Sequence, residues 1–380
     1  MEIDFKNPTP LYRQIVEAIK SRIASGKLKV GDQIGSQQEL ARKYDVSLIT
    51  VKKAMAELIN EGVLFSRVGK GTYVAEQSPA SNLSKHESIG LVFRNLRGPL
   101  FSLIIPSIEK VLSDYGFNIL LANSDNQIEK EERLICHFRK IEVNGLIIAS
   151  MTHVLHATSI IRKLHEEHFP YVVVSYIEDK DINYVGSDHK YGAFLATEHL
   201  IKLGYENIGY INGEEGNHLG ELRKQGYQRA LQQYGKSYHE EFIFRLRRGG
   251  EWDDYHSGYD IGKKFAQLSW KPDAMFIYND VSALGFQKAI LDQGLKIPED
   301  VAIVGFDNVK RGRIANVPLT TVHQPTARIG ELAAKSLIER IKGGKPQNRV
   351  LLKPELVIRD SCGAKVRTES KGFEKESRSF

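Results

Sequence analysis

Residues 36–74 read SQQELARKYDVSLITVKKAMAELINEGVLFSRVGKGTYV, a stretch in which two helical patterns follow each other closely. Ser36 and Ser47 each precede such a pattern and can accept hydrogen bonds from the free amides of the next turn. Gly62 supplies the stop signal of the second helix. The positions expected to face inward are Leu40 and Tyr44 on the first helix and Val51, Ala54, Met55, Leu58 and Ile59 on the second. With a tight turn through Tyr44–Val46, the stretch predicts a helix-turn-helix.

A hairpin is predicted directly after these helices. Val63–Arg67 and Thr72–Val74 are β-prone runs around Val68–Gly71, whose glycines can adopt the positive φ of a tight turn. Upstream, an amphipathic helix is predicted from apolar residues that recur every four positions: Leu11, Ile15, Ile19 and Ile23. Residues 1–75 are therefore expected to form a winged helix-turn-helix, followed by a linker over 76–88 that is rich in Ser, Pro and Asn.

A winged helix-turn-helix binds duplex DNA by placing the start of its last helix in the major groove, where side chains meet base edges. Thr50 and Lys52 suit polar contacts there, and Ser47 is expected mainly as a cap. Leu48 or Ile49 could at most touch a thymine methyl group. The candidate DNA-contacting residues are Gln38, Ser47, Leu48, Thr50, Lys52, Arg67, Gly69 and Lys70. The alternative is a three-helix module for protein contacts in which the lysines are ordinary surface charges.

The charge of the chain is concentrated at its two ends. The 380 residues carry a net charge of +6, of which +3 falls on residues 1–76 and +2 on residues 361–380, so the 284 residues between them are nearly neutral. A basic segment on a neutral body is typical of a protein that binds a polyanion with one part and has another task for the rest. Residues 361–380 are polar and lack apolar periodicity, which predicts a disordered tail.

The composition, with 41% hydrophobic and 26% charged residues, excludes collagen-like, coiled-coil and disordered classes. No basic segment followed by an apolar run opens the chain, so we expect a cytoplasmic protein. Cys136 and Cys362 lack Cys or His partners at zinc spacing, and His153 and His156, expected on an exposed helix, are not at zincin spacing. The pair Asp253–Asp254 is expected to be surface charge. We therefore expect no metal site, no cofactor and no catalytic residue.

From residue 89 onward, apolar runs of strand length alternate with amphipathic runs of helix length. The strand candidates are Ile89–Phe93, Ile119–Ala122, Gly145–Ala149, Tyr171–Ser175, Ile208–Ile211, Ala274–Tyr278 and Val301–Phe306. Such alternation predicts parallel sheets joined by right-handed crossovers. The length exceeds one compact sheet, so two α/β lobes are expected over residues 89–360. A TIM barrel is the competing fold, but the strand pairs near Tyr184–Gly186 and Leu356–Arg359 lack the helix that a barrel places after each strand.

Residues 8–74 resemble the DNA-binding domain of the GntR family. The motifs that carry this resemblance are Pro10–Ile15, Gly26–Asp32, Glu39–Ala41, Val46–Ser47, Thr50–Val51, Glu61–Gly62 and Gly69–Thr72. Two features depart from the family pattern: Gly35–Gln37 stands where Pro-Ser-Glu is usual, and Leu48 and Lys52 replace arginines. Because arginine is the better bidentate partner of guanine, an operator contact common in the family is expected to be absent or remade.

Residues 88–360 resemble the ligand-binding domain of the LacI/GalR repressors, which is similar to periplasmic sugar-binding proteins. The motifs, in family order, are Ile89–Val92, Leu120–Ser124, Val143–Ile148, Asp188 with Gly192, Ala196–Leu200, Arg223 with Gly226–Tyr227, Pro272–Ala274, Asn279–Gly285, Ile297–Asp307 and Leu319–Gln324. A GntR head on a LacI/GalR body is the arrangement of repressors similar to the arabinose repressors of Gram-positive bacteria. The resemblance implies a periplasmic-binding-protein-like domain of two lobes with an effector pocket between them.

The effector-binding residues that the resemblance implies are Phe101, Arg223, Trp252, Asn279, Asp307 and Gln324. The polar members would hold sugar hydroxyls, and the two aromatic rings would pack on the C–H face of the sugar. Ligands in open α/β sheets also lie beyond the carboxyl ends of strands, where several of these residues fall. The alternatives are an interlobe salt bridge for Arg223, a cap for Asp307 and core packing for Trp252. Ser175 stands where the family commonly has an acid, which weakens one hydroxyl contact and fits a smaller or deoxygenated ring.

The resemblance implies a DNA-binding regulator, most simply a repressor of carbohydrate-utilisation genes. Two chains would pair as a homodimer through their bodies and place two heads on the half-sites of a near-palindromic operator. A small carbohydrate, such as arabinose or a related pentose or deoxyhexose, would close the lobes and release the DNA, although promotion of DNA binding stays open. The alternative is a cytoplasmic sugar-binding or sugar-active protein whose N-terminal module is only an interaction domain.

Overall fold

The computed structural model describes residues 4, 9–60, 62–67, 71–75, 87–96, 98, 100–150, 153, 155–247 and 251–365. The chain divides into two compact units, Met1–His86 and Glu87–Phe380, which we call the head and the body. Residues 76–86 of the predicted linker and 366–380 of the predicted tail lie outside the described residues. The predicted end of the linker at residue 88 is wrong, because Ser88 already belongs to the first strand of the body. Within the described ranges, no helix is long and apolar enough to cross a membrane.

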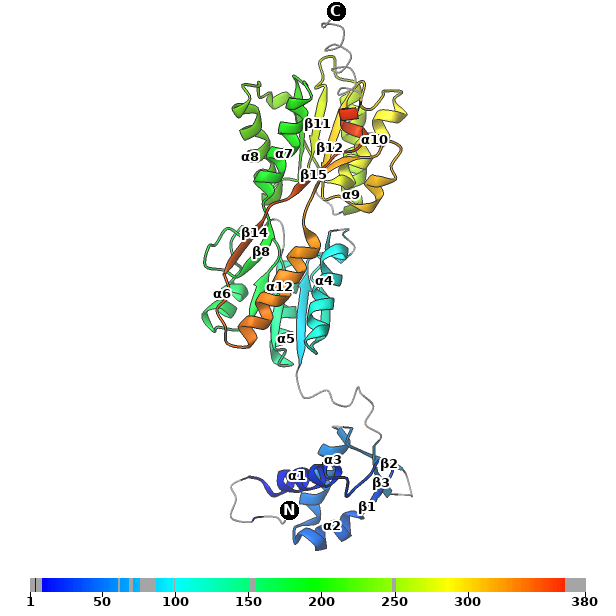
Figure 1. The fold of residues 1–380 in the computed structure, drawn as a ribbon, viewed down its shortest axis with the longest axis vertical. Helices are drawn as coiled ribbons and strands as arrows, with labels where there is room; N and C mark the ends of the chain where they lie inside the picture. The colour runs from blue at the N-terminus through cyan, green and yellow to red at the C-terminus, as the bar shows by residue number, and fades with distance from the viewer. Residues whose placement is uncertain are drawn as a thin grey trace, which may run out of the picture. The chain divides into compact units, whose positions relative to one another are not determined.

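The described part of the head contains three α-helices and a three-stranded antiparallel sheet of order β1-β3-β2 (Figure 1). The elements are α1 (Leu11–Ala24), β1 (Gln33–Ile34), α2 (Gln37–Tyr44), α3 (Leu48–Asn60), β2 (Leu64–Arg67) and β3 (Gly71–Val74). The predicted helix-turn-helix and hairpin are confirmed. Strand β1 was not predicted, because two residues are too short to show a period.

Side-chain hydrogen bonds explain where α2 and α3 begin. The Ser36 hydroxyl accepts from the amide of Glu39 at 3.2 Å, and the Glu39 carboxylate accepts in return from the Ser36 amide at 2.7 Å, which is a capping box. The Ser47 hydroxyl accepts from the amide of Thr50 at 3.2 Å. Between the helices, Asp45 has a left-handed φ of 53° and turns the chain.

One apolar cluster holds the head together. It contains the residues predicted to face inward, Leu40, Tyr44, Val51, Ala54, Met55 and Leu58, packed against Ile15 and Ile19 of α1 and Leu64 and Val74 of the hairpin. The prediction for Ile59 is wrong, since its side chain is 37% exposed. The buried positions of α3 follow the helical period and end at Leu58. Ile59 is the next residue, so its side chain points about 100° away from that of Leu58 and out of the core.

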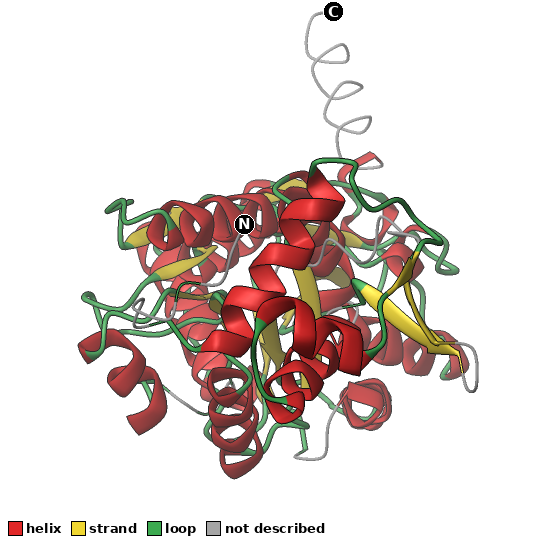
Figure 2. Ribbon diagram, turned by 90° about the horizontal axis from the view of Figure 1, so that it is seen from below, coloured by secondary structure: helices red, strands yellow, loops and turns green. Residues whose placement is uncertain are grey.

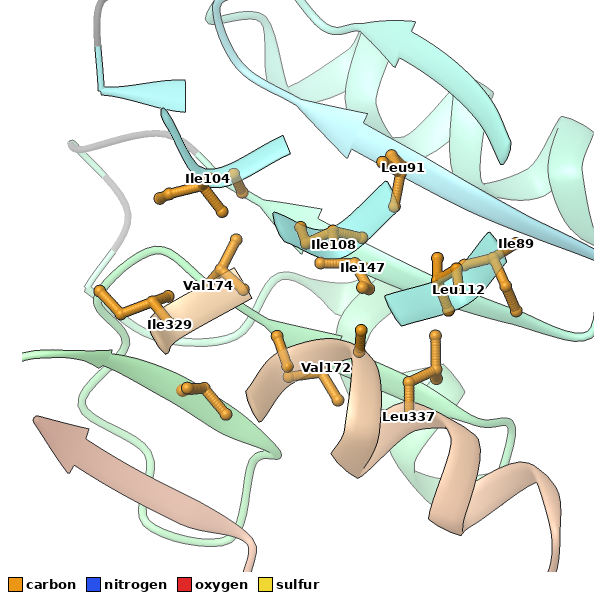
Figure 3. Close-up of a cluster of buried hydrophobic side chains, with 14 of the residues drawn as sticks. Ile89, Leu91, Ile104, Ile108, Leu112, Ile147, Val172, Val174, Ile329 and Leu337 are labelled. Atoms are coloured by element: carbon orange, nitrogen blue, oxygen red, sulfur yellow. The ribbon is translucent and has the colours of Figure 1, made fainter. Parts of the chain in front are cut away.

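The body contains two six-stranded sheets, each with helices on both faces. Figure 2 shows strands in yellow among the surrounding helices in red. Each sheet with its helices forms one lobe, and we call the lobe that contains the first strand of the body the N-lobe and the other the C-lobe. The N-lobe sheet is wholly parallel, with order β14-β8-β7-β6-β4-β5. Its strands are β4 (Ser88–Phe93), β5 (Asn118–Asn123), β6 (Gly145–Ala149), β7 (Tyr171–Val173), β8 (Tyr184–Ser187) and β14 (Arg349–Leu352). Helices α4 (Phe101–Asp114) and α12 (Thr326–Ile341) cover one face through a cluster that includes Ile108, Ile147 and Leu337 (Figure 3). Helices α5 (Ile128–Lys140) and α6 (Ser159–Glu166) cover the other.

The C-lobe sheet has the order β10-β9-β11-β12-β13-β15, and only β15 pairs antiparallel within it. Its strands are β9 (Ile208–Asn212), β10 (Ile243–Arg245), β11 (Ala274–Ile277), β12 (Ala302–Phe306), β13 (Thr320–His323) and β15 (Glu355–Val357). Its helices are α7 (His189–Lys202) and α8 (His218–Gln233) on one face, α9 (Glu251–Ala266) and α10 (Asp280–Asp292) on the other, and the short α11 (Lys310–Arg313). Helices α9 and α10 approach so closely that a Cβ on Gly285 would lie 2.0 Å from the carbonyl oxygen of Tyr255.

Along the described residues the chain passes between the lobes three times: from β8 to α7, from β13 to α12, and from β14 to β15. The two-lobed fold is confirmed, and the TIM barrel is wrong. All seven predicted strands are present, whereas β10, β13 and β14 were not predicted. The start of the predicted tail is structured, because Ser361 and Cys362 are buried in a 3-10 helix against the C-lobe and the Ser361 hydroxyl donates to the carbonyl of Ile303 at 2.7 Å.

Candidate functional site

The head has a groove of about 870 Å³ along the start of α3. The start of α2, residues 33–36 and the first residues of β3 form its other walls. Three of the predicted DNA-contacting residues, Gln38, Leu48 and Lys52, line this groove, and Gln38 and Lys52 are exposed. The groove therefore extends from α3, the helix predicted to enter the major groove, to β3 of the hairpin that forms the wing.

The remaining predicted DNA contacts lie around this groove or beyond the described residues. The Ser47 and Thr50 hydroxyls lie 2.8 Å apart and hydrogen-bond each other. Arg67 is exposed on the hairpin, with its guanidinium 5.3 Å from the ring centroid of Phe65. Gly69 and Lys70 are outside the described residues.

A second candidate site is a cavity of about 110 Å³ in the body, where the carboxyl ends of strands from both lobes converge. The N-lobe contributes Arg94, Asn95, Leu100, Phe101 and Asn126 to its wall, and the C-lobe contributes Glu214, Asn217, Leu219, Arg223, Asp254, Tyr278, Asn279, Val281 and Asp307. Most of these side chains are polar or charged. The cavity therefore suits a small ligand with several hydrogen-bonding groups.

Arg223 of α8 is the central cation of this cavity. Its side chain is 3% exposed and its guanidinium lies 3.7 Å from the ring centroid of Phe306. It donates to the carbonyl of Tyr278 and lies 3.6 Å from Asp307 Oδ1. Its Nη2 is 3.4 Å from His189 Nδ1, and burial together with the Arg223 charge holds the pKa of His189 well below its usual value. The imidazole is therefore neutral and can accept this hydrogen bond.

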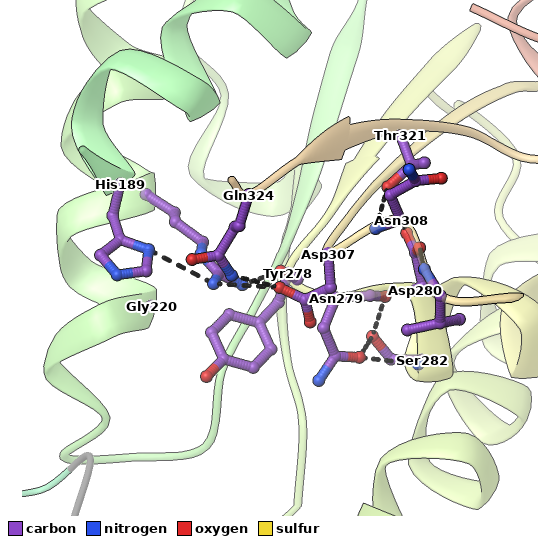
Figure 4. A network of polar contacts seen from close by, with 12 residues as sticks. His189, Gly220, Tyr278, Asn279, Asp280, Ser282, Asp307, Asn308, Thr321 and Gln324 are labelled. Atoms are coloured by element: carbon purple, nitrogen blue, oxygen red, sulfur yellow. Dashed lines mark hydrogen bonds and ion pairs between the residues drawn. The ribbon is translucent and has the colours of Figure 1, made fainter. Parts of the chain in front are cut away.

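Asp307 follows β12 in an unusual backbone conformation. Its φ is 113°, a sparsely populated region for a residue with a side chain, and such strain clusters at functional sites. Gln324 Nε2 donates to Asp307 Oδ1 at 2.7 Å (Figure 4), and Gln324 itself does not line the cavity. Burial raises the pKa of Asp307 above its usual value, against the opposing effect of Arg223. Both members of this ion pair belong to the C-lobe, so the interlobe salt bridge considered for Arg223 is wrong.

Asn279 connects two helices at the cavity wall. Its Oδ1 caps α10 by accepting from the amide of Ser282 at 2.8 Å, and its Nδ2 donates to Asp254 Oδ2 at 2.7 Å. Asp254 lies on α9 and lines the cavity, so the prediction that it is surface charge is wrong. The start of α9 lies at the cleft, which local sequence could not indicate.

The N-lobe wall is formed around Phe101, the first residue of α4. This side chain is buried, and its ring packs edge-on against Phe93 with 5.1 Å between ring centroids. The Arg94 guanidinium lies 4.6 Å from the Phe101 centroid and donates to the carbonyl of Ser150 at 2.9 Å. Phe101 is thus held by contacts from the end of β4, and Arg94 links this strand end to the residue that follows β6.

His153 makes a contact between the lobes. It lies in the loop between β6 and α6, so its predicted place on a helix is wrong. Its Nε2 is 3.5 Å from Glu214 Oε1 and 3.2 Å from the carbonyl oxygen of Glu215, both of which belong to the C-lobe. This contact lies at the edge of the cavity, since Glu214 is one of the lining residues.

Two buried carboxyl groups lie behind the cavity wall. Glu131 Oε1 accepts from the Ser150 hydroxyl at 2.8 Å, and burial raises the pKa of Glu131 to about 7. Asp280 accepts from the Thr321 hydroxyl at 2.6 Å and from the amide of Val309 at 2.8 Å, and burial raises its pKa to about 8. Both groups support the strand ends from which the ligand-facing residues project.

The structure brings together most of the predicted effector-binding residues. Phe101, Arg223, Asn279 and Asp307 line the cavity, Gln324 lies behind Asp307, and the side chain of Trp252 is outside the described residues. The lining residues that sequence analysis missed include Arg94, Asn126, Glu214, Asp254 and Tyr278. All of these except Asp254 come within a few residues of a strand end, so the rule that ligands lie beyond such ends was the available signal.

Comparisons with known proteins agree with this division. Residues 11–74 match the bacterial regulatory proteins of the gntR family, and residues 197–362 match the periplasmic binding protein-like domain. An arabinose metabolism transcriptional repressor of Geobacillus stearothermophilus is 30% identical over 93% of this chain and 97% of its own length. Among solved structures, the regulator CcpA of Lactococcus lactis matches with a TM-score of 0.65 and 27% identity over 73% of this chain and 99% of that one.

A LacI-family regulator from Enterococcus faecium, solved with bound ribose, matches with a TM-score of 0.62 and 27% identity over 72% of this chain and 98% of that one. The full-length similarity to a curated repressor and the two domain matches define the family. The chain therefore belongs to the DNA-binding transcriptional repressors that join a GntR-type winged helix-turn-helix to a periplasmic-binding-protein-like domain.

Proposed function

We propose that this repressor acts in the cytoplasm on carbohydrate-utilisation genes and is controlled by a small neutral sugar that binds between the lobes. The observation that carries the proposal is the composition of the cavity wall. Asn126, Asn217, Asn279 and the charged residues offer both donors and acceptors, as a ring of hydroxyl groups requires. Phe101 and Tyr278 supply the apolar surface that the C–H face of a sugar needs.

The charges of the wall favour a neutral ligand over a phosphorylated one. Two cations, Arg94 and Arg223, face three carboxyl groups, those of Glu214, Asp254 and Asp307. Arg223 is already paired with Asp307 and enclosed by aromatic rings. A phosphate would thus meet more negative than positive charge, whereas hydroxyl groups can pair with both signs.

The size of the cavity favours a monosaccharide. One water needs about 10–15 Å³ of such space, so about 110 Å³ holds roughly seven to eleven water-sized groups. A pentose has about that many non-hydrogen atoms. The named relatives fit this size: one represses arabinose metabolism, and one structure holds ribose. We propose arabinose or a related pentose or deoxyhexose as the effector.

In the proposed mechanism, sugar binding stabilises the closed arrangement of the lobes. The contacts available for closure include His153 with Glu214, on opposite sides of the cleft. Two bodies pair as a homodimer, and closure changes the separation at which the two heads meet the operator half-sites. DNA affinity then falls by a coupling free energy, typically about 1–3 kcal/mol. The proposed DNA contacts are those named above: Gln38, Ser47, Leu48, Thr50, Lys52, Arg67, Gly69 and Lys70.

Thermal-shift and calorimetric titrations of the full chain with arabinose, ribose, fucose and arabinose 5-phosphate test the effector assignment. We expect a neutral sugar to raise the melting temperature and the phosphate to have no effect. Asp254→Asn should weaken sugar binding about tenfold, because it removes a charged acceptor. Asp260→Asn is the matched control on the same helix, since Asp260 pairs with Arg247 and Lys263 rather than lining the cavity.

Gel shifts with promoter fragments from the source genome test the coupling. We expect the sugar that binds to release the DNA. Tighter DNA binding on sugar addition would make the sugar a corepressor, and failure of every neutral sugar to bind would refute the effector assignment while leaving the repressor itself intact.

A further inference from the structure

The first turn of α3 presents apolar rather than polar side chains to its surroundings. The only hydroxyl groups of this turn, on Ser47 and Thr50, lie 2.8 Å apart, and the Ser47 oxygen also accepts from the Thr50 amide. Each hydroxyl therefore makes at least one hydrogen bond within the helix cap. Leu48 is 39% exposed and Ile49 is 78% exposed. Beside the Ser47 and Thr50 hydroxyls, these two apolar side chains are what the start of α3 offers to a DNA base.

The exposure of Ile49 is unusual within the described part of the head. The other large apolar side chains exposed there are Val30 at 55%, Leu48 at 39% and Ile59 at 37%. Single exposed apolar residues are common on protein surfaces and need no explanation. Here, however, two adjacent ones occupy the turn of the helix that enters the major groove in a winged helix-turn-helix. Leu48 also lines the groove of the head beside Lys52 and Gln38.

Among the four bases, thymine alone exposes a methyl group in the major groove. We propose that Leu48 and Ile49 determine operator specificity by contacting thymine methyl groups. These contacts replace the contact to guanine that an arginine at the position of Leu48 would make. Successive side chains point roughly 100° apart around a helix. The two residues therefore contact different thymines, and each operator half-site contains two positions at which the thymine methyl is required. The proposal rests on the DNA-binding function and adds the chemistry of the recognised bases.

The direct test removes only the methyl groups. The full-length chain is used to enrich binding duplexes from a random pool, and each thymine of the enriched duplex is then replaced singly by deoxyuridine. We expect two replacements per half-site to weaken binding about fourfold each, the value for burial of one methyl group. This measurement uses the unaltered protein, so it does not depend on the folding of any variant.

Variants assign each methyl to a side chain. Leu48→Ala and Ile49→Ala should each bind the thymine duplex more weakly and should each lose sensitivity to one of the two deoxyuridine positions. Ile59→Ala is the matched control, because Ile59 is a partly exposed apolar residue near the other end of the same helix, and it should keep both sensitivities.

Equal binding of all deoxyuridine duplexes would overturn the proposal, and so would variants that retain full sensitivity. Enrichment of no duplex at all would instead overturn the DNA-binding function, and this proposal with it. The two failures are therefore distinguishable.

Discussion

The ion pair between Arg223 and Asp307 should be a major determinant of the stability of the body, and Asp307→Asn is the perturbation that tests this. The substitution keeps the size of the side chain and an oxygen that can accept from Gln324. It leaves the Arg223 charge without its carboxylate, in a position where the two side chains are 3% and 13% exposed. Breaking a buried pair by removing one partner typically costs about 3–5 kcal/mol.

The expected cost here is at the lower end, about 3 kcal/mol. Arg223 keeps the carbonyl of Tyr278 and the ring of Phe306, 3.7 Å away, as partners. Urea unfolding of the full chain, followed by tryptophan fluorescence and circular dichroism, measures the loss in the transition of the body. The exposed pair of Arg247 and Asp260, with side chains 69% and 38% exposed, provides the control: Asp260→Asn should cost less than about 1 kcal/mol.

A double variant completes this test. In Arg223→Met with Asp307→Asn no buried charge is left without a partner, so its loss of stability should be clearly smaller than the sum of the two single losses. Additive losses, or a loss for Asp307→Asn no larger than that of the exposed control, would refute the view that the pair is a coupled unit. Sugar affinity should be lost in both single variants.

Three further perturbations have defined outcomes. As pH rises from about 4.5 to about 7, the unaltered protein should lose up to about 3 kcal/mol of unfolding free energy relative to Glu131→Gln. The reason is that the Glu131 pKa is about 7 in the folded chain, which therefore holds a proton that the unfolded chain releases. Urea unfolding of both proteins at about pH 5 and pH 8 measures this loss, and an equal stability difference at both pH values would contradict it. Gly285→Ala should destabilise the body by about 1–3 kcal/mol in thermal unfolding, since the new Cβ would lie 2.0 Å from the Tyr255 carbonyl oxygen and force α9 away from α10. His153→Ala should weaken sugar binding severalfold in calorimetry without changing DNA affinity in the absence of sugar, because His153 contacts the opposite lobe; unchanged sugar affinity would show that the contact does not support closure.

The sequence predicted those elements whose pattern is local and complete. The central strands of the two sheets, such as β4, β6, β9, β11 and β12, are buried on both faces and are therefore continuous apolar runs. Strand β13 did not show this pattern because two of its four residues, Thr320 and Thr321, are polar. Both are nevertheless fully buried, since their hydroxyl groups have hydrogen-bond partners far away in the sequence. The Thr321 hydroxyl donates to Asp280, and the Thr320 hydroxyl accepts from the Arg359 amide. Strands β10 and β14 lie at sheet edges and are only partly buried, so their runs are short and mixed.

The candidate site was predicted only in part for a related reason. The resemblance supplied Arg223, Asn279 and Asp307, and the strand-end rule indicated which edge of each sheet to consider. Neither the resemblance nor the strand-end rule indicates that Asp254, near the start of α9, accepts a hydrogen bond from Asn279 Nδ2 at 2.7 Å. Such a meeting depends on how α9 packs against α10, and this is a property of the assembled lobe rather than of any segment.

The triple crossing between the lobes has a consequence for synthesis on the ribosome. The head is complete once about the first seventy-five residues have emerged, whereas the N-lobe still lacks α12 and β14, which end at Leu352. Until then β8 is an uncovered sheet edge and the α4 face has no partner helix. A message truncated between residue 76 and that point yields a chain with a complete winged helix-turn-helix and an incomplete body, so nonsense mutations in this part of the gene should leave the DNA-binding part without the domain proposed to control it.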